Sequence, residues 1–365
     1  MTGRLLALHE EQGQSPWLDN LQRGYLTSGH LDDLVRRGVR GLTSNPTIFQ
    51  KAIQGSNDYD AEFRALLASG ATAEEAYWKL VLSDIRAAAD VFAPLHAASN
   101  GTDGFVSVEV DPRLARDTDG TVSSGLALRA AAGRPNVMVK VPATREGIPA
   151  IRRLVAEGTN VNVTLIFGLQ RYAEVMEAHI AGLQDRLDAG QPVDVISGVA
   201  SFFISRVDTE IDRRLAAHDD PSASRLAGRA AVAQAVLAYG LFRTTFAGPR
   251  WEALASRGAK VQRPLWASTS TKNPAYPDTL YVDSLIGPDT VNTLPDQTLE
   301  AFDDHGTPAR TIDSDPAAAR EVWNSLETLG IRADDVADTL EREGLASFVA
   351  SFEDLLGSLA EKARG

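Results

Sequence analysis

Val137-Met138-Val139-Lys140-Val141 is a short apolar stretch with one charged residue, and stretches of this kind decide the fold. On either side of it, similar short runs alternate with longer amphipathic segments, a pattern typical of strands separated by helices. Strands joined by helices pair in parallel and carry the helices on the outside. The runs expected to form about eight strands lie near residues 17–18, 39–42, 105–110, 137–141, 161–167, 193–199, 264–267 and 280–282.

About eight parallel strands with helices outside them close naturally into a barrel. We therefore expect an α/β fold, a (β/α)8 TIM barrel with additional helices, notably at the C-terminal end. No repeat, low-complexity tract or linker divides the sequence, so residues 1–365 are expected to form a single barrel domain. A C-terminal helical region is expected from about residue 296, and it includes helices near 316–329 and 333–343.

Capping residues predict where some helices begin and end. Ser28 is expected to cap a helix that runs to Arg37, and Gly38 is expected to end it. Thr72 is expected to begin a long helix toward Ala98.

The composition excludes several classes of function. Apolar residues make up 44% of the chain and charged residues 23%, which is typical of a folded soluble protein. The formal net charge of −13 opposes binding to nucleic acid or to anionic membranes, since both need a basic face. A small anionic substrate stays compatible with this charge, because it needs only a few cations gathered in one cleft.

The sequence contains no pattern that indicates a metal site or a cofactor-binding motif. The chain has no cysteine, which excludes disulfides, thiolate nucleophiles and zinc-thiolate sites. Its six histidines lack the spacing of metal ligands, so no metal is expected. No nucleotide-binding or serine-hydrolase motif occurs, and no cofactor is expected. The start of the chain does not resemble a signal peptide and no apolar run is long enough to span a bilayer, so a cytoplasmic location is expected.

Three of the expected strands carry polar residues on one face only. The polar residues are Ser107 and Glu109 in the first, Lys140 in the second, and Asn162 and Thr164 in the third. Side chains of a barrel strand alternate between the interior and the surrounding helices, so each of these polar groups is expected to point inward. Glu109 and Lys140 lie toward the carboxyl ends of their strands, where barrel enzymes assemble their active sites.

An inward-facing lysine has two interpretations. Burial disfavours a charged ammonium, and a desolvated amine is a suitable nucleophile for a Schiff base. The alternative is a structural ion pair between Lys140 and Glu109. Asn162 and Thr164 favour the catalytic interpretation, because a simple ion pair would not need them.

Two long motifs resemble the signatures of the transaldolase family, in the right order and on the expected strands. They are Gly41-Leu42-Thr43-Ser44-Asn45-Pro46-Thr47-Ile48-Phe49 and Val137-Met138-Val139-Lys140-Val141-Pro142-Ala143-Thr144-Arg145-Glu146-Gly147-Ile148. Shorter stretches, Trp17-Leu18-Asp19, Val108-Glu109-Val110-Asp111-Pro112-Arg113 and Asn162-Val163-Thr164-Leu165-Ile166-Phe167, are similar to further motifs of that family. The resemblance is to long bacterial, actinobacterial-like members and covers roughly residues 19–283.

The resemblance implies a function. A transaldolase transfers a dihydroxyacetone unit from sedoheptulose 7-phosphate or fructose 6-phosphate to glyceraldehyde 3-phosphate or erythrose 4-phosphate, in the non-oxidative pentose phosphate pathway. Lys140 would form the Schiff base with the ketose, and Asp19 would act as acid and base on the C4 hydroxyl. Glu109 and Thr164 would hold a water that relays protons. The protein would work without a cofactor, as a monomer or a homodimer.

The same resemblance assigns the residues that bind substrate. Asn45 and Asn162 would bind sugar hydroxyls and the retained three-carbon unit. The segment Ser201-Phe202-Phe203-Ile204-Ser205-Arg206, expected after the sixth strand, resembles a phosphate-binding segment of the family. Its candidate ligands are Ser201, Phe203 and Arg206. After the seventh strand Ser268 is a further candidate, but Ser270 stands where well-known members have an arginine, and Lys272 would substitute for it.

Two other functions compete with transaldolase. The first is a fructose-6-phosphate aldolase of the same superfamily, which would release free dihydroxyacetone. Those relatives are shorter, usually have Gln where this chain has Glu109, and carry Tyr in place of Phe203. The second is a non-catalytic barrel that binds sugar phosphates, which Lys140 and Glu109 both argue against.

Overall fold

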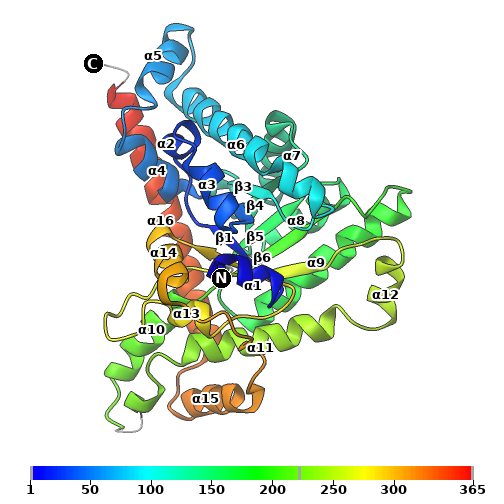
Figure 1. Cartoon of the computed structure of the whole chain (residues 1–365), viewed down its shortest axis with the longest axis vertical. Coiled ribbons are helices and arrows are strands. Elements are labelled where there is room, and N and C mark those ends of the chain that lie inside the picture. The colour runs from blue at the N-terminus through cyan, green and yellow to red at the C-terminus, as the bar shows by residue number, and fades with distance from the viewer. Residues whose placement is uncertain (1–2, 221–222, 363–365) are drawn as a thin grey trace.

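The computed structural model of the protein describes residues 3–220 and 223–362. Its centre is a closed barrel of eight parallel strands that follow one another in sequence order. Helices surround this barrel (Figure 1), so the expected (β/α)8 fold is confirmed. The strands are β1 (Gln14–Leu18), β2 (Gly41–Leu42), β3 (Phe105–Glu109), β4 (Val137–Pro142), β5 (Val161–Ile166), β6 (Gly198–Phe203), β7 (Gln262–Ala267) and β8 (Thr290–Leu294).

The helices join the strands or extend beyond them. Within the described part of the chain they alternate with the strands as far as β8, and α14, α15 and α16 follow it. The helices are α1 (Arg4–Glu10), α2 (Arg23–Thr27), α3 (His30–Arg37), α4 (Pro46–Gln54), α5 (Asp60–Ala68), α6 (Ala73–Ala98), η1 (Pro112–Leu114), α7 (Thr118–Ala132), α8 (Gly147–Ala156), α9 (Leu169–Asp188), α10 (Ser205–Ala216), η2 (Ala223–Leu226), α11 (Ala230–Thr245), α12 (Pro249–Ala255), α13 (Leu280–Asp283), α14 (Asp296–His305), α15 (Pro316–Thr328) and α16 (Ala333–Lys362).

The register of neighbouring strands brings the polar residues together. Glu109 of β3 lies opposite Lys140 of β4, and Lys140 in turn lies opposite Asn162 of β5. Thr164 pairs with Pro142, which is two residues after Lys140 and therefore on the same face of β4. Three strands therefore present their polar side chains at adjacent levels near the carboxyl end of the barrel.

Two expected strands are in the wrong place. Residues 280–282 form the short helix α13, and its Tyr281 and Val282 are buried as one turn of helix. The eighth strand is β8 instead, whose sequence Thr-Val-Asn-Thr-Leu is mostly polar and gave no apolar signal. The sixth strand was expected at residues 193–199 but begins at Gly198. Val193 and Ile196 are buried in the turn before it, so their apolar character does not come from a strand. Ser201 and Phe203 therefore lie within β6 and not after it.

The capping predictions are partly confirmed. Thr72 caps α6 in a full capping box with Glu75, and Gly38 ends α3 in a left-handed conformation. The prediction for Ser28 is wrong, because the segment is divided into α2 and α3 and the cap of α3 is Gly29. The Ser28 hydroxyl only accepts a 3.3 Å hydrogen bond from the amide of His30.

The last helix, α16, covers part of the barrel mouth. Figure 1 shows α16 (red) running past α4 and on toward α10, and it packs against both helices and against β5. It extends to Lys362, far beyond the expected end near residue 343. Its buried face includes Leu340, Gly344, Phe348 and Phe352, which recur every four residues as on one side of a helix.

Polar contacts hold α16 beside α4. The hydroxyls of Thr47 and Ser351 are 2.8 Å apart, and Gln54 Nε2 donates to the Ser358 hydroxyl at 2.8 Å. Gln50 of α4 also donates to Asp354 of α16. Each pair is separated by 304 residues in the sequence, so the two helices run parallel and in step.

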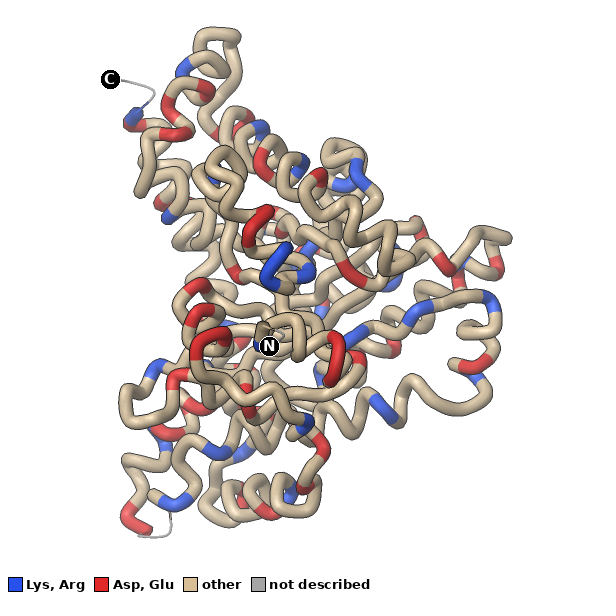
Figure 2. The backbone as a smooth tube through the Cα atoms, viewed as in Figure 1, with Lys and Arg blue, Asp and Glu red and all other residues tan. Residues whose placement is uncertain are grey.

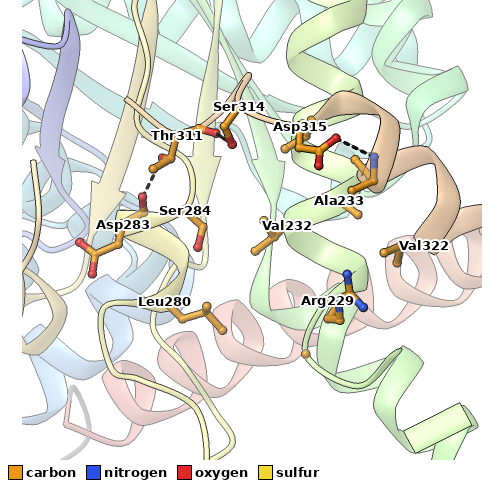
Figure 3. Close-up of a pocket in the computed structure, with 14 residues that line it drawn as sticks. Arg229, Val232, Ala233, Leu280, Asp283, Ser284, Thr311, Ser314, Asp315 and Val322 are labelled. Carbon is orange, nitrogen blue, oxygen red and sulfur yellow. Dashed lines mark hydrogen bonds between the residues drawn. The ribbon is translucent and has the colours of Figure 1, made fainter. Parts of the chain in front are cut away.

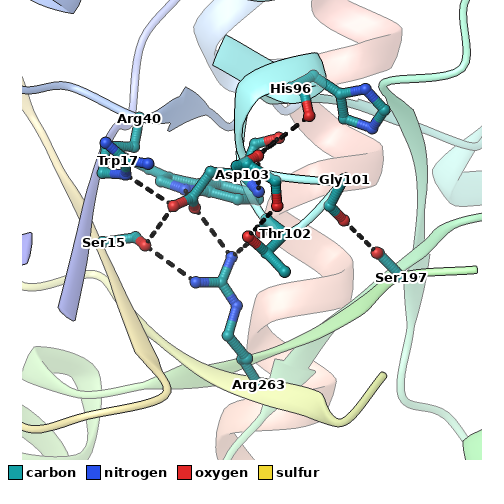
Figure 4. Close-up of polar contacts among 10 residues, drawn as sticks. Ser15, Trp17, Arg40, His96, Gly101, Thr102, Asp103, Ser197 and Arg263 are labelled. Atoms are coloured by element: carbon teal, nitrogen blue, oxygen red, sulfur yellow. Dashed lines mark hydrogen bonds and ion pairs between the residues drawn. The ribbon is translucent and has the colours of Figure 1, made fainter. Parts of the chain in front are cut away.

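A buried carboxylate, Asp103, links several strands at the opposite, amino end of the barrel through hydrogen bonds and ion pairs (Figure 4). Asp103, just before β3, accepts hydrogen bonds from Arg40 Nε at 2.7 Å, Arg263 Nη2 at 3.0 Å and Ser15 Oγ at 2.9 Å. Burial alone would raise the pKa of the Asp103 carboxyl, but Arg263 and Arg40 hold it below its usual value. The cluster joins the starts of strands that are far apart in the sequence.

Charged residues of both signs are spread over the helices that surround the barrel (Figure 2). Among the described residues, no helix is long and apolar enough to cross a membrane.

Candidate active site

Lys140 lies inside the barrel near its carboxyl end. Its side chain is 5% exposed, and Nζ is 3.4 Å from Glu109 Oε2, whose side chain is 2% exposed. Nζ also donates a 3.2 Å hydrogen bond to the backbone carbonyl of Ser44, just after β2. The ring centroid of Phe348, from α16, lies 5.9 Å from Nζ. The ion pair is therefore present, and the amine also reaches a cavity.

Glu109 has an unusual setting for a carboxylate. Burial raises its pKa to about 7, although the positive charge of Lys140 opposes this shift. Neither of its oxygens accepts a hydrogen bond from the described residues, and the buried hydroxyl of Thr164 has no partner there either. A carboxyl group with a pKa near neutrality can both accept and return a proton.

Asp19 follows β1 directly and faces the same cavity. Its Oδ1 accepts a 2.7 Å hydrogen bond from the hydroxyl of Thr43, which is 2.7 Å from the hydroxyl of Thr293 in β8. Burial raises the pKa of Asp19, while Lys140 and the hydrogen bond from Thr43 lower it. Residue patterns did not single out Thr43 or Thr293. Thr43 stands inside the quoted Gly-Leu-Thr-Ser-Asn-Pro motif, whereas Thr293 lies on the strand that the pattern missed.

The cavity between these groups has a volume of about 110 Å³ at the carboxyl end of the barrel. It gathers most of the expected site residues, while Glu109, Asn162 and Thr164 lie outside its lining. Lining residues that the sequence analysis did not name include Thr293, Pro295 and Phe348, and Phe348 comes from the unpredicted part of α16. The expected residues that line it are Asp19, Asn45, Lys140, Ser201, Phe203, Arg206, Ser268 and Lys272.

The amide side chains are held by specific hydrogen bonds. Asn162 Nδ2 donates to Ser107 Oγ at 3.0 Å, and its Oδ1 accepts from Ser201 Oγ at 2.7 Å, so the three side chains link β3, β5 and β6. Asn45 caps α4, since its Oδ1 accepts a 2.9 Å hydrogen bond from the amide of Ile48. The remaining amide group of Asn45 is available to a ligand in the cavity, which Asn45 lines.

Two cations line the cavity next to the barrel mouth. Arg206, at the start of α10, has its guanidinium carbon 5.2 Å from the ring centroid of Phe203, and none of its nitrogens bonds to a described residue. Burial lowers the pKa of Arg206, which marks a partly desolvated charge. Lys272 donates to the hydroxyl of Ser270 at 2.6 Å, and burial together with Arg206 and Lys51 lowers its pKa. Positive charge is therefore concentrated at this end of the cavity.

Ser268 completes that end. It has a left-handed backbone conformation with φ of 57°, which is unusual for a residue other than glycine and is found often at functional sites. Its carbonyl accepts a 3.0 Å hydrogen bond from the amide of Ser205, and the two hydroxyls are 2.9 Å apart. These contacts join the loop after β7 to the start of α10, and so to Arg206.

A larger hollow lies elsewhere. It measures about 410 Å³ between α11, α13 and α15 (Figure 3) and is lined mainly by apolar side chains. Its acidic groups are already engaged: Asp283 accepts from Thr279 and from the amide of Thr307, and Asp315 caps α15. The two carboxylates of this hollow are therefore already hydrogen-bonded within the protein. Within the described residues, no group of three or more His, Asp or Glu side chains is placed to hold a metal ion.

The fold and the site define a class of protein: a (β/α)8 barrel with a buried lysine and carboxylate beside a cationic cavity. Residues 16–359 match the family model described as Transaldolase/Fructose-6-phosphate aldolase. The transaldolase of Thermobifida fusca is 49% identical over 354 residues, which cover 96% of each chain. The transaldolase of a Parafrankia species is 50% identical over 352 residues, covering 96% of this chain and 95% of the relative. Transaldolase 1 of Streptomyces avermitilis is 48% identical over 357 residues, covering 97% and 94%.

The chain belongs to the Transaldolase/Fructose-6-phosphate aldolase family, and its nearly full-length similarity to actinobacterial members places it among the transaldolase enzymes of that family.

Proposed function

We propose that this enzyme carries out transfer through a Schiff base on Lys140. The observation that carries the proposal is the position of the amine: buried, 3.4 Å from Glu109 Oε2, and open to the cavity that Arg206 and Lys272 line. A structural ion pair alone would not need access to a cationic cavity. The amine attacks the ketose carbonyl, the resulting carbinolamine loses water, and the protonated imine then withdraws electrons from the C3–C4 bond.

The carboxyl groups would move the protons. Asp19 would take the proton from the C4 hydroxyl as the C3–C4 bond breaks, so that an aldose leaves and a three-carbon enamine stays on Lys140. The enamine adds to the aldehyde carbon of the acceptor, and Asp19 returns the proton to the new hydroxyl. Glu109, whose pKa is about 7, would exchange protons through a water held with Thr164 as the carbinolamine forms and dehydrates. The carboxylate oxygens of Glu109 and the hydroxyl of Thr164 have no hydrogen-bond partner among the described residues, which supports a role in holding that water.

The substrates would be phosphorylated sugars. Arg206 can bind a phosphate with two parallel hydrogen bonds, and Ser268 and Lys272 would add a hydroxyl and a second cation. Phe203 and Ser201 would shape the adjoining wall, while Asn45 and Asn162 would hold sugar hydroxyls. We infer donors such as sedoheptulose 7-phosphate or fructose 6-phosphate and acceptors such as glyceraldehyde 3-phosphate or erythrose 4-phosphate, the exchange made in the non-oxidative pentose phosphate pathway.

Trapping with borohydride tests both the chemistry and the residue. Fructose 6-phosphate followed by borohydride should fix a three-carbon or six-carbon adduct on the peptide that contains Lys140, as read by mass spectrometry. An adduct on another lysine, or none in an active enzyme, would exclude the proposal. The same preparation should release glyceraldehyde 3-phosphate continuously only when erythrose 4-phosphate is present, because without an acceptor each active site stops after a single cleavage. Steady release without an acceptor would indicate an aldolase.

A further inference from the structure

Gly344 is a buried glycine in the interior of the 30-residue helix α16. Glycine weakens a helix interior relative to alanine because it loses more backbone freedom on folding. Gly344 is not among the residues of left-handed conformation, so backbone geometry does not require it. Gly357 offers a comparison within the same helix: a methyl group added there would meet nothing within 4 Å. A packing contact must therefore explain the glycine at 344.

The space beside Gly344 is filled from the barrel. A methyl group at this position would lie 3.0 Å from Leu165 Cδ2, 3.4 Å from Arg206 Nη1 and 3.7 Å from Phe167 Cε2. The first distance is shorter than ordinary carbon contacts, so either Leu165 or the helix would have to move. Leu165 is only 1% exposed, so its side chain can move only if the side chains around it also move.

Packing alone holds the guanidinium of Arg206. It forms no hydrogen bond or ion pair with the described residues. It lies beside the Phe203 ring on β6, and Nη1 is 3.4 Å from the point where a side chain at position 344 of α16 would begin. One turn further along the same face, Phe348 lies over Lys140. Different residues of α16 therefore face the two ends of the cavity: Gly344 lies beside Arg206 at the phosphate end, and Phe348 lies over the nucleophile.

We propose that Gly344 is a positioning residue for phosphate recognition, because its missing side chain lets α16 approach Arg206 and fix the guanidinium toward the cavity. This inference rests on the proposed role of Arg206 in binding substrate phosphate. The C-terminal helix then contributes to specificity for phosphorylated sugars without touching the substrate at this position.

The test compares Gly344→Ala with Gly357→Ala, which adds the same methyl group to the same helix without a contact. For Gly344→Ala we expect a severalfold higher KM for fructose 6-phosphate, a similar rise in the inhibition constant of inorganic phosphate, and a kcat near that of wild type. Gly357→Ala should leave all three values unchanged. In an Arg206→Ala background, Gly344→Ala should cause no further rise in KM, because the residue acts through Arg206.

Unchanged KM and phosphate inhibition in a folded Gly344→Ala protein would overturn the inference, as would an equal effect of Gly357→Ala or an additive effect in the Arg206→Ala background. Folding is checked by circular dichroism and thermal unfolding. If Gly344→Ala does not fold, adding Leu165→Ala removes the closest contact while the methyl group stays against Arg206, and the same rise in KM is expected. Failure of the inference leaves wild-type transfer and trapping on Lys140 intact, whereas failure of the proposed function removes them.

Discussion

At the scale of single residues, Glu109 and Lys140 depend on each other. The lysine would keep the buried carboxyl partly ionised, and the carboxyl offers the lysine a nearby proton acceptor at 3.4 Å. Their inward direction follows from the alternation of two short strands, so it could be predicted from the sequence. The closeness of Ser44 and Phe348 could not, because these residues arrive from a loop and from a helix about 200 residues further along the chain.

The pH dependence of the rate should report Glu109. If the ionised carboxylate accepts the proton, kcat/KM should rise with pH and level off above an apparent pKa of about 7. Glu109→Gln should lower kcat by roughly 10²- to 10⁴-fold, the usual contribution of acid and base catalysis, and should remove this limb of the profile. A wild-type profile that is flat from pH 5.5 to 8.5 would show that another group carries the proton.

Substitutions of Lys140 separate the nucleophile from the ion pair. Lys140→Met should abolish borohydride trapping and lower the rate by roughly 10³-fold or more, as expected for loss of a covalent nucleophile. Lys140→Arg should fail as well, because the guanidinium stays protonated and is not a nucleophile. Thermal unfolding is measured in parallel. Transfer by Lys140→Arg at near wild-type rate would mean that the residue serves only to pair with Glu109.

At the scale of elements, the strands with strong apolar alternation were predictable and the others were not. β3, β4 and β5 combine valines with an isolated inward polar residue, and all three lie where the sequence placed them. β8 has only two apolar residues. The nearby segment that forms α13 is more apolar, and it was therefore predicted as the eighth strand in place of β8. Thr293 lines the cavity, whereas Thr290 and Asn292 donate hydrogen bonds to the carbonyls of Gly287 and Tyr281 just before the strand, so β8 carries polar residues on both faces and lacks an apolar alternation.

The helix α16 should protect the covalent intermediate from water. Phe348→Ala should open the cavity above Lys140 and increase the acceptor-independent release of dihydroxyacetone severalfold, because water then competes with the acceptor sugar. Ala350→Ser, at an exposed position of the same helix, is the control and should not change the ratio of release to transfer. An unchanged ratio in Phe348→Ala would show that this side chain does not exclude water.

At the scale of the whole molecule, the two ends of the barrel have different tasks. The cavity occupies the carboxyl end, and the Asp103 cluster ties the amino end (Figure 4). The sequence predicted the barrel, and most of the residues that it proposes for the site line one cavity at the carboxyl end. It did not predict the cluster, because Arg40, Asp103 and Arg263 meet only after the strands have closed. The cytoplasmic location, the single domain and the monomer or homodimer stay predictions.

The Asp103 cluster should contribute stability with little effect on catalysis. Asp103→Ala leaves the partly buried guanidinium groups of Arg40 and Arg263 without a carboxylate partner, so we expect a loss of up to about 3–5 kcal/mol in the free energy of unfolding. Asp90→Asn, which breaks an exposed ion pair with Arg134, should cost about 0–1 kcal/mol. Denaturant unfolding gives both values, and kcat of the folded proteins should equal that of wild type. A large fall in kcat for Asp103→Ala would mean that the two ends are coupled.

The sign of the pH effect follows from the lowered pKa of Asp103. Its ionised form is the one stabilised in the folded protein, so its contribution is fully present above the unfolded pKa of about 3.9 and is lost as the pH falls through the lower folded value. The difference in stability between wild type and Asp103→Ala should therefore be constant near neutral pH and shrink below about pH 4. A difference that grows on acidification would contradict this assignment.

The parallel, in-step pairing of α4 with α16 has a practical consequence, because the protein contains no native thiol. Cysteines introduced in pairs at the constant offset, such as Thr47→Cys with Ser351→Cys, would face each other with no competing sulfhydryl anywhere in the chain. Oxidation would then fasten the C-terminal helix to the barrel reversibly, and a single cysteine at either position would give a site-specific attachment point for a fluorophore or spin label. Because the chain has no other cysteine to label, spectroscopy on such variants can measure whether α16 moves during turnover.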